Sequence, residues 1–128
     1  LLPDTACSEN YLKLSGAASL GAVCSSTVVP LEKLPKGAEF KANYEKKFPG
    51  QAVQVYAPIT YDAVYALVDA IKKAGAVDKA KIAAAIPSVS IDGLSGKMAF
   101  MPKGERKDAE IAVLEDKGGK FEVIEIIK

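Results

Sequence analysis

The sequence predicts an α/β fold in which helices pack on a mixed sheet and the chain closes with a C-terminal β-hairpin. Residues 54–75 read as the end of a short strand that runs directly into an amphipathic helix, the basic unit of such folds. Near the end of the chain, apolar residues alternate with period two on either side of Gly118 and Gly119, which is the pattern of a hairpin. At 128 residues the chain has room for one domain with its own core.

The first part of the chain reads as a helix followed by a strand. Ser8 is suited to cap a helix over residues 9–14, and Gly16 is suited to end it. A strand is expected over residues 21–27. Two prolines within residues 28–37 then indicate a loop or a crossover segment.

A second helix is predicted over residues 38–48. Its aromatic residues Phe40, Tyr44 and Phe48 recur at fourfold spacing, which places them on one side of the helix. A Pro-Gly pair follows and is expected to end the helix, because proline lacks the amide hydrogen that the next turn requires.

The next unit is the strand and helix of residues 54–75. The strand is predicted over residues 52–57, and Pro58 is expected to hold the residue before it extended, so that Tyr56 lies at the carboxyl edge of a sheet. Thr60 is suited to cap the helix over residues 60–74, which a glycine ends. The large apolar residues of this helix form one broad face that something must cover: Tyr61, Val64, Tyr65, Leu67, Val68 and Ile71.

Asp62 falls in the first turn of that helix, where the helix dipole favours a negative charge. A further helix is predicted over residues 79–86, with Asp78 as its cap. A turn and a strand follow over residues 91–101, and then a polar loop over residues 102–108. The two strands of the terminal hairpin are expected over residues 109–114 and 120–126.

Composition and charge exclude several classes of function. The formal net charge is +1, and the longest basic cluster, Lys103, Arg106 and Lys107, is interrupted by acidic residues, so no nucleic-acid partner is expected. No apolar run approaches the roughly 20 residues that a membrane-spanning helix requires. The sequence also opens without the charged and apolar regions of a signal peptide, which indicates either a cytosolic protein or one whose signal has been removed.

The residue types present also argue against catalysis. The chain contains no histidine, so a Ser-His-Asp or Cys-His arrangement cannot form. Residues 93–98 have a glycine-rich appearance but lack the spacing and the Ser or Thr of a phosphate-binding loop, so they are interpreted as a turn. Without histidine or a Cys-x-x-Cys pair, a zinc site is not expected. We therefore predict no enzymatic activity and no metal or other cofactor.

The two cysteines, Cys7 and Cys24, leave two alternatives open. Sixteen residues separate them, and a disulfide closing that loop would stabilise the fold by about 3 kcal/mol and indicate an exported protein. Alternatively, both are free thiols that act as small buried hydrophobic residues.

Asp4 and Tyr56 are the candidate ligand-binding residues. Asp4 lies just before the first predicted helix, and Tyr56 lies at a predicted strand end. Each also has an ordinary structural explanation: Asp4 as a capping or turn residue, and Tyr56 as a half-buried strand residue. Taken together, a carboxylate for an ammonium group and an aromatic ring for a side chain are what a site for a small zwitterion requires.

Three blocks of sequence carry a resemblance to a known family: Ile-Thr-Tyr-Asp-Ala-Val-Tyr-Ala-Leu at 59–67, Ile-Asp-Gly-Leu-Ser-Gly-Lys-Met-Ala-Phe at 91–100, and Gly-Glu-Arg-Lys-Asp-Ala-Glu-Ile-Ala-Val at 104–113 with Gly-Lys-Phe-Glu-Val at 119–123. In order and spacing they resemble the C-terminal part of the periplasmic substrate-binding proteins of branched-chain amino-acid ABC transporters. The resemblance covers nearly the whole chain and does not specify the ligand.

This resemblance implies part of a type I periplasmic binding fold, which has two lobes and is two to three times longer than this chain. The 128 residues would then be a C-terminal fragment. Residues 1–28 resemble a piece of the second lobe, residues 30–103 part of the first lobe, and residues 108–128 the final return to the second lobe.

The resemblance also implies roles for individual residues. Asp4 resembles the acidic residue that binds the α-ammonium group of the ligand, and Tyr56 resembles the aromatic residue that lines the pocket for the ligand's side chain. Cys7 and Cys24 resemble a pair that many members oxidise to a disulfide. The intact protein would be periplasmic, would close on an amino acid or a related small zwitterion, and would present its closed form to an ABC permease.

The same resemblance leaves an alternative function open, that of a ligand-binding sensory or receptor module of the same fold. The residues that bind the ligand's carboxylate would belong to the missing N-terminal part, so we expect weak or undetectable ligand binding by this chain alone. Its exposed helix faces would be covered either by that part or by a second copy in a homodimer.

Overall fold

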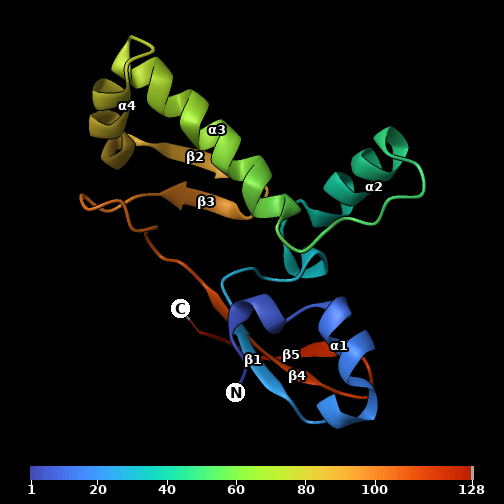
Figure 1. Cartoon of the computed structure of the whole chain (residues 1–128). Helices are drawn as coiled ribbons and strands as arrows, with labels where there is room; N and C mark the ends of the chain where they lie inside the picture. The colour runs from blue at the N-terminus through green and yellow to red at the C-terminus, as the bar shows by residue number, and fades with distance from the viewer. Residues whose placement is uncertain (128) are drawn as a thin grey trace. The chain divides into compact units, whose positions relative to one another are not determined.

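The computed structural model describes residues 1–127. The chain divides into two compact units (Figure 1). Unit 1 contains residues 1–29 and the chain from Ala109 onward, and unit 2 contains residues 30–108. The polypeptide therefore leaves unit 1 after Val29, builds unit 2 without interruption, and returns to unit 1 after Asp108.

Unit 1 is an antiparallel three-stranded sheet, in the order β1-β4-β5, with short helical segments. Its segments are η1 (Asp4–Ala6), α1 (Glu9–Ser15), η2 (Gly16–Ser19), β1 (Val23–Ser26), β4 (Ile111–Asp116) and β5 (Phe121–Ile127). Strand β1 pairs with β4 along its whole length, and β4 pairs with β5 with one irregularity at Val113/Leu114. An isolated parallel bridge joins Leu2 to Cys24, which adds a parallel pairing at the edge of the sheet.

Local signals define the elements of unit 1, and they agree with the sequence-based predictions. The Ser8 side chain accepts a hydrogen bond from the Tyr11 amide and caps α1. The β4–β5 hairpin is confirmed, and Gly118 and Gly119 adopt φ angles of 82° and 93°, which glycine tolerates best. Asp116 secures the turn because its Oδ1 accepts hydrogen bonds from the amides of Gly119 and Lys120, at 2.7 and 3.1 Å.

A disulfide joins Cys7 to Cys24 at the centre of unit 1, which decides between the two alternatives left open by the sequence. Both cysteines are buried in one cluster with Ala112 and Leu114 of β4. The disulfide therefore ties the segment before α1 to β1 within the core of the sheet. Leu2, Phe121 and Val123 pack around this cluster.

Unit 2 consists of a long helix, shorter helices and a β-hairpin. Its segments are η3 (Leu31–Lys33), α2 (Gly37–Lys47), α3 (Ala57–Ala74), α4 (Lys79–Ala85), η4 (Ile86–Ser88), β2 (Ser90–Gly93) and β3 (Gly96–Ala99). Figure 1 shows α3 lying along the antiparallel β2–β3 hairpin, with α4 at its far end. The core between them contains Ala66 and Ala70 of α3, Val89, and Met98 of β3.

The predicted helices of unit 2 are confirmed. Asp78 caps α4 by accepting a hydrogen bond from the Lys81 amide at 2.9 Å. Gly75 ends α3 with a φ angle of 65°, and its amide donates to the carbonyls of Ile71 and Lys72. Residues 91–101 were predicted to be a turn and one strand, but the chain forms two strands, β2 and β3, with the predicted turn between them.

The strand predicted over residues 52–57 is wrong. Residues 51–54 form no regular element, and α3 begins at Ala57 rather than at Thr60. Pro58 lies in the first helical turn, where its missing amide hydrogen has no intrahelical partner to lose, so it starts the helix instead of holding Ala57 extended. Tyr56 is therefore the N-cap residue of α3 and not the end of a strand.

The packing of α3 also differs from the sequence-based expectation. The residues of α3 that this chain buries are Pro58, Asp62, Ala66 and Ala70, a narrow stripe at fourfold spacing. The broad face of large apolar residues is mostly exposed: Tyr61, Val64, Tyr65, Leu67 and Val68 are 41–56% accessible. Small side chains let the hairpin approach α3 closely, while the larger side chains find no cover within the described residues.

Candidate functional site

Asp4 lies in unit 1 at the start of η1, and two hydrogen bonds fix its carboxylate. Its Oδ2 accepts from the backbone amide and from the hydroxyl of Thr27, each at 3.1 Å. Thr27 directly follows β1, so the carboxylate joins the start of the chain to the end of that strand. The side chain remains partly exposed. This geometry holds a negative charge in one orientation at the surface of unit 1.

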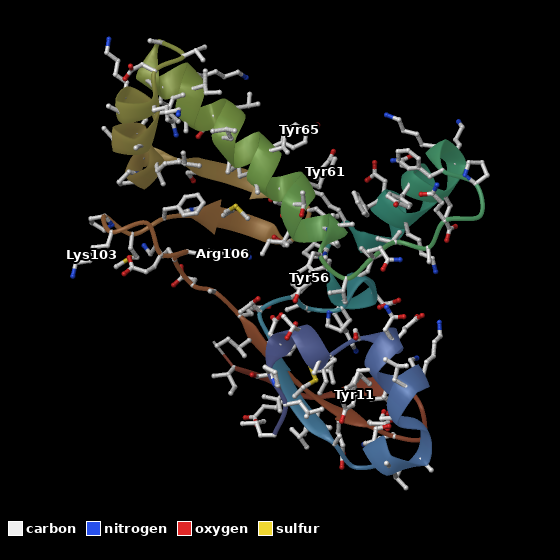
Figure 2. The ribbon with its side chains drawn as sticks, in the orientation of Figure 1. Tyr11, Tyr56, Tyr61, Tyr65, Lys103 and Arg106 are labelled. Carbon is white, nitrogen blue, oxygen red and sulfur yellow. A yellow bond between two sulfur atoms is a disulfide. The ribbon has the colours of Figure 1, made fainter. Side chains whose placement is uncertain are left out.

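Tyr56 lies in unit 2, 43% exposed, at the N-terminus of α3 (Figure 2). The Tyr56 carbonyl accepts the first hydrogen bond of the helix, from the Thr60 amide at 3.0 Å. The start of α3 therefore fixes the backbone from which the ring projects. Asp4 and Tyr56 belong to different units, and the geometry of each is defined within its own unit.

Unit 2 carries a groove of about 920 Å³ between α2, the segment before α3, α3 itself and the end of β2. Tyr56 is one of its lining residues. Five aromatic rings form a continuous row along it, with neighbouring ring centroids 4.9–6.1 Å apart: Phe48, Tyr44, Phe40, Tyr61 and Tyr65. The spacing predicted for α2 therefore does place its rings on one side, and that side faces α3. Figure 2 shows Tyr61 and Tyr65 on the flank of α3 that is turned away from the hairpin.

The groove has an apolar floor and a rim of balanced charge. The rim residues are three lysines and three acids: Lys36, Lys47, Lys72, Glu39, Asp69 and Asp92. Lys36 and Asp92 form an ion pair at 3.0 Å. The Tyr61 hydroxyl donates to that of Tyr65 at 3.3 Å, and this hydrogen bond, with burial second, raises the pKa of Tyr61 above its usual 10.0. The raised pKa keeps the Tyr61 hydroxyl uncharged at neutral pH, as a surface for apolar contact requires.

Sequence reasoning missed a buried polar network behind α3. Asp62 was interpreted as a favourable charge in the first helical turn, but its side chain is fully buried and accepts hydrogen bonds from the turn between β2 and β3. The one available signal was its spacing of four residues from Ala66, which places a carboxylate on the stripe of small residues. Arg106 joins this network from the loop that follows β3.

The described residues contain neither a metal-binding cluster nor a membrane-spanning helix. Within residues 1–127, no group of three or more His, Cys, Asp or Glu side chains is placed to hold a metal ion. No helix in this part of the chain is both long enough and apolar enough to cross a membrane.

The chain has the fold of part of the type I periplasmic binding proteins, as the similarity to solved structures shows. The chain superposes on a leucine-binding protein from Thermotoga maritima with a TM-score of 0.81 and 24% sequence identity, covering 98% of this chain and 36% of that one. It also matches a leucine-, isoleucine-, valine-, threonine- and alanine-binding protein from Brucella ovis in a closed conformation, with a TM-score of 0.70, 17% identity, and 96% and 35% of the two chains covered.

A third match is an ABC-transporter solute-binding protein from R. palustris in complex with benzoate, with a TM-score of 0.67, 19% identity, and 90% and 32% of the two chains covered. The chain thus spans about a third of the length of these proteins. No curated protein matches the sequence.

The family model for periplasmic binding proteins matches residues 4–120, and the chain belongs to this family. The fold class predicted from the sequence is therefore confirmed. Because the family is one of binding proteins, the expectation that the chain is not an enzyme is confirmed as well.

Proposed function

We propose that the chain is part of the solute-binding component of an ABC importer for amino acids or related small zwitterions. Asp4 binds the ammonium group of the ligand, and Tyr56 lines the pocket for the ligand's side chain. The observation that carries this proposal is the fixed Asp4 carboxylate, which Thr27 holds with two hydrogen bonds. Because its orientation is set before the ligand arrives, less entropy is lost on binding.

The division of the chain supports a two-lobed binding mechanism. We propose that residues 1–28 and 108–128 belong to the second lobe and residues 30–103 to the first, and the unit boundaries at 29/30 and 108/109 support this proposal. Asp4 then lies in the second lobe and Tyr56 in the first. A ligand that contacts both lobes favours the closed state, which an ABC permease in the membrane recognises. Membership of the family supports a periplasmic location.

We predict that Asp4→Asn in the full-length protein weakens L-leucine binding by roughly a hundredfold, because the ammonium group loses its charged partner. Titration calorimetry measures the affinity, and Glu9→Gln, an exposed charge change in the same unit, is the matched control. The isolated 128-residue chain should show weak or undetectable binding of L-leucine.

Benzoate serves as a second probe because it has a carboxylate and no ammonium group. Asp4→Asn should not weaken benzoate binding, since the lost charge has no partner on that ligand. A protein that binds benzoate and not L-leucine, or an isolated chain with micromolar affinity for L-leucine, would contradict the proposed ligand and the proposed need for a second part.

We further propose that the groove of unit 2 is covered in the full-length protein by the polypeptide that the longer relatives possess and this chain lacks. The exposed face of α3 supports this, since contiguous apolar surface of this kind marks an interface. The rim of balanced charge around an aromatic floor is the arrangement of a protein contact and not of a nucleic-acid or anionic membrane surface.

Tyrosine nitration followed by mass spectrometry tests this cover. Tyr61 and Tyr65 should be modified in the isolated chain and protected in the full-length protein, while Tyr11 of unit 1 provides an internal reference. Equal modification in both proteins would contradict the proposal. Protection in the isolated chain that grows with concentration, together with a dimer in sedimentation, would show that a second copy covers the face instead.

A further inference from the structure

The starting observation is the buried carboxylate of Asp62, whose side chain has no solvent exposure. Oδ1 accepts a hydrogen bond from the Leu94 amide at 2.6 Å, and Oδ2 accepts from the amide and the hydroxyl of Ser95 at 2.8 and 2.5 Å. A buried charge persists when its oxygens are satisfied in this way. All three bonds go to the two central residues of the turn between β2 and β3, so Asp62 attaches that turn to α3.

The turn is built to admit this carboxylate. A Cβ atom at Gly93 would lie 2.6–2.7 Å from the carboxyl atoms of Asp62, so only glycine allows the close approach. Gly96 closes the turn with a φ angle of 92°. The turn and α3 therefore form one interlocked body.

Arg106 extends the network toward the end of unit 2. Its guanidinium donates a hydrogen bond to the Ser95 hydroxyl at 3.3 Å, and that hydroxyl donates its own hydrogen to Asp62. Ser95 thus stands between a buried anion and a cation and uses both capacities of its hydroxyl group. Arg106 is the labelled side chain beside the segment after β3 in Figure 2.

Arg106 also lies at the exit of unit 2. It pairs with Phe100 in an isolated bridge, and the next amide, that of Lys107, donates to the Ala99 carbonyl at 2.8 Å. Asp108, the last residue of the unit, has a φ angle of 54°, the only positive φ among the non-glycine residues that the structure describes. The network therefore ends two residues before the chain returns to unit 1.

We propose that Asp62, Ser95 and Arg106 form a relay that fixes the outgoing link of unit 2 to α3, and that Asp62 and Ser95 thereby act as positioning residues for ligand binding. Tyr56 is the N-cap of α3, and the helix carries Asp62 in its second turn. Through these contacts α3 connects the aromatic wall of the proposed site to the second of the two links between the units, the one that follows Asp108. This role rests on the proposed function, because it sets affinity without touching the ligand.

Different groups of Ser95 and its neighbour attach the turn to α3 and connect the turn to Arg106. The amide hydrogen bonds from Leu94 and Ser95 keep the turn on α3, and they do not depend on the Ser95 hydroxyl. The hydroxyl alone carries the connection onward to Arg106. Removing it should therefore loosen the link, which backbone contacts to Phe100 and Ala99 still hold, while the turn and the fold remain in place.

Ser95→Ala tests the relay in the chain as it stands, by amide hydrogen exchange. We expect the Lys107 amide to exchange roughly tenfold faster, the effect of losing about one hydrogen bond. Exchange in β4 and β5 should not change. Ser95→Thr, which keeps the hydroxyl, should restore slow exchange at Lys107.

Asp69→Asn is the matched control because Asp69 lies on the same helix and anchors the other end of β2. It accepts from Lys73 Nζ at 2.7 Å and from the Ser90 amide at 3.4 Å, and the bond from Lys73 keeps its pKa below the usual 3.8. This change should leave Lys107 exchange as in the wild type. Unchanged exchange at Lys107 in Ser95→Ala, or equal acceleration in Asp69→Asn, would overturn the relay.

The second readout is the affinity of the full-length protein for L-leucine. Ser95→Ala should weaken it several-fold, and Ser95→Thr should restore it. A wild-type protein that does not bind L-leucine would contradict the proposed function, and the exchange experiment would still decide the relay. Faster exchange at Lys107 with unchanged affinity would overturn the coupling to the ligand.

Discussion

Replacing Cys7 and Cys24 together by alanine is expected to lower the free energy of unfolding of unit 1 by about 3 kcal/mol. The disulfide joins positions 17 residues apart with α1 between them, and its removal lets the unfolded chain sample many more conformations. The cysteines also fill the core against Ala112 and Leu114, so alanine leaves small voids that add to the loss.

Amide exchange in β1 and β4 measures this effect unit by unit, which is necessary because the two units need not unfold together. The slowest amides of β4 should exchange roughly a hundredfold faster in the double variant. Treating the wild type with dithiothreitol should reproduce the change, and the same treatment should have no effect on the variant. Unaltered exchange in β4 after reduction would show that the sheet alone stabilises unit 1.

Gly93→Ala is expected to destabilise unit 2 by about 3 kcal/mol. The added methyl group would lie within 2.7 Å of the buried Asp62 carboxylate, so either the turn moves away from α3 or the carboxylate loses hydrogen bonds. Both outcomes expose a charge that the native turn satisfies completely.

A double-mutant cycle with Asp62→Ala isolates this cause. The three atoms nearest to the added methyl all belong to the Asp62 carboxyl group, so Gly93→Ala should cost much less when that group is absent. Thermal unfolding followed by circular dichroism gives the four stabilities. Equal cost in both backgrounds would mean that the backbone conformation of Gly93, and not the carboxylate, requires glycine.

Elements with local signals were predicted well from the sequence. The cap at Ser8, the cap at Asp78 and the stop at Gly75 each depend on residues within one helical turn, and the structure contains all three. The terminal hairpin has the same origin, since alternation and a Gly-Gly turn define it within one short segment. Such features can be predicted from the sequence because interactions between neighbouring residues stabilise them.

Elements that depend on distant partners were predicted poorly. Residues 52–57 have the composition of a strand, but a strand needs a neighbour to pair with, and the described residues supply none at that place. The same holds for α3, whose large apolar face suggested the core while the chain buries the face of Asp62, Ala66 and Ala70. Helical periodicity shows that the faces of α3 differ in polarity. It does not show which of these faces the chain buries.

The residues of the candidate site also differ in how far the sequence could predict them. Residue type and position indicate Asp4 and Tyr56, and their roles stay predictions that the binding experiments address. Asp62 was overlooked because its partners lie 32 and 33 residues further along the chain. A carboxylate that satisfies a distant turn has no local signature.

The discontinuous build of unit 1 has a consequence for the order in which the protein assembles during synthesis. Unit 2 is complete once residue 108 has emerged, whereas β1 must wait for its neighbour, because Val23 pairs with Glu115. Domains fold as units while the chain is made, and pairings between distant segments form late. We therefore expect unit 2 to fold first. Meanwhile, β1 keeps one edge unpaired, and β4 pairs with that edge only when the last part of the chain returns to unit 1.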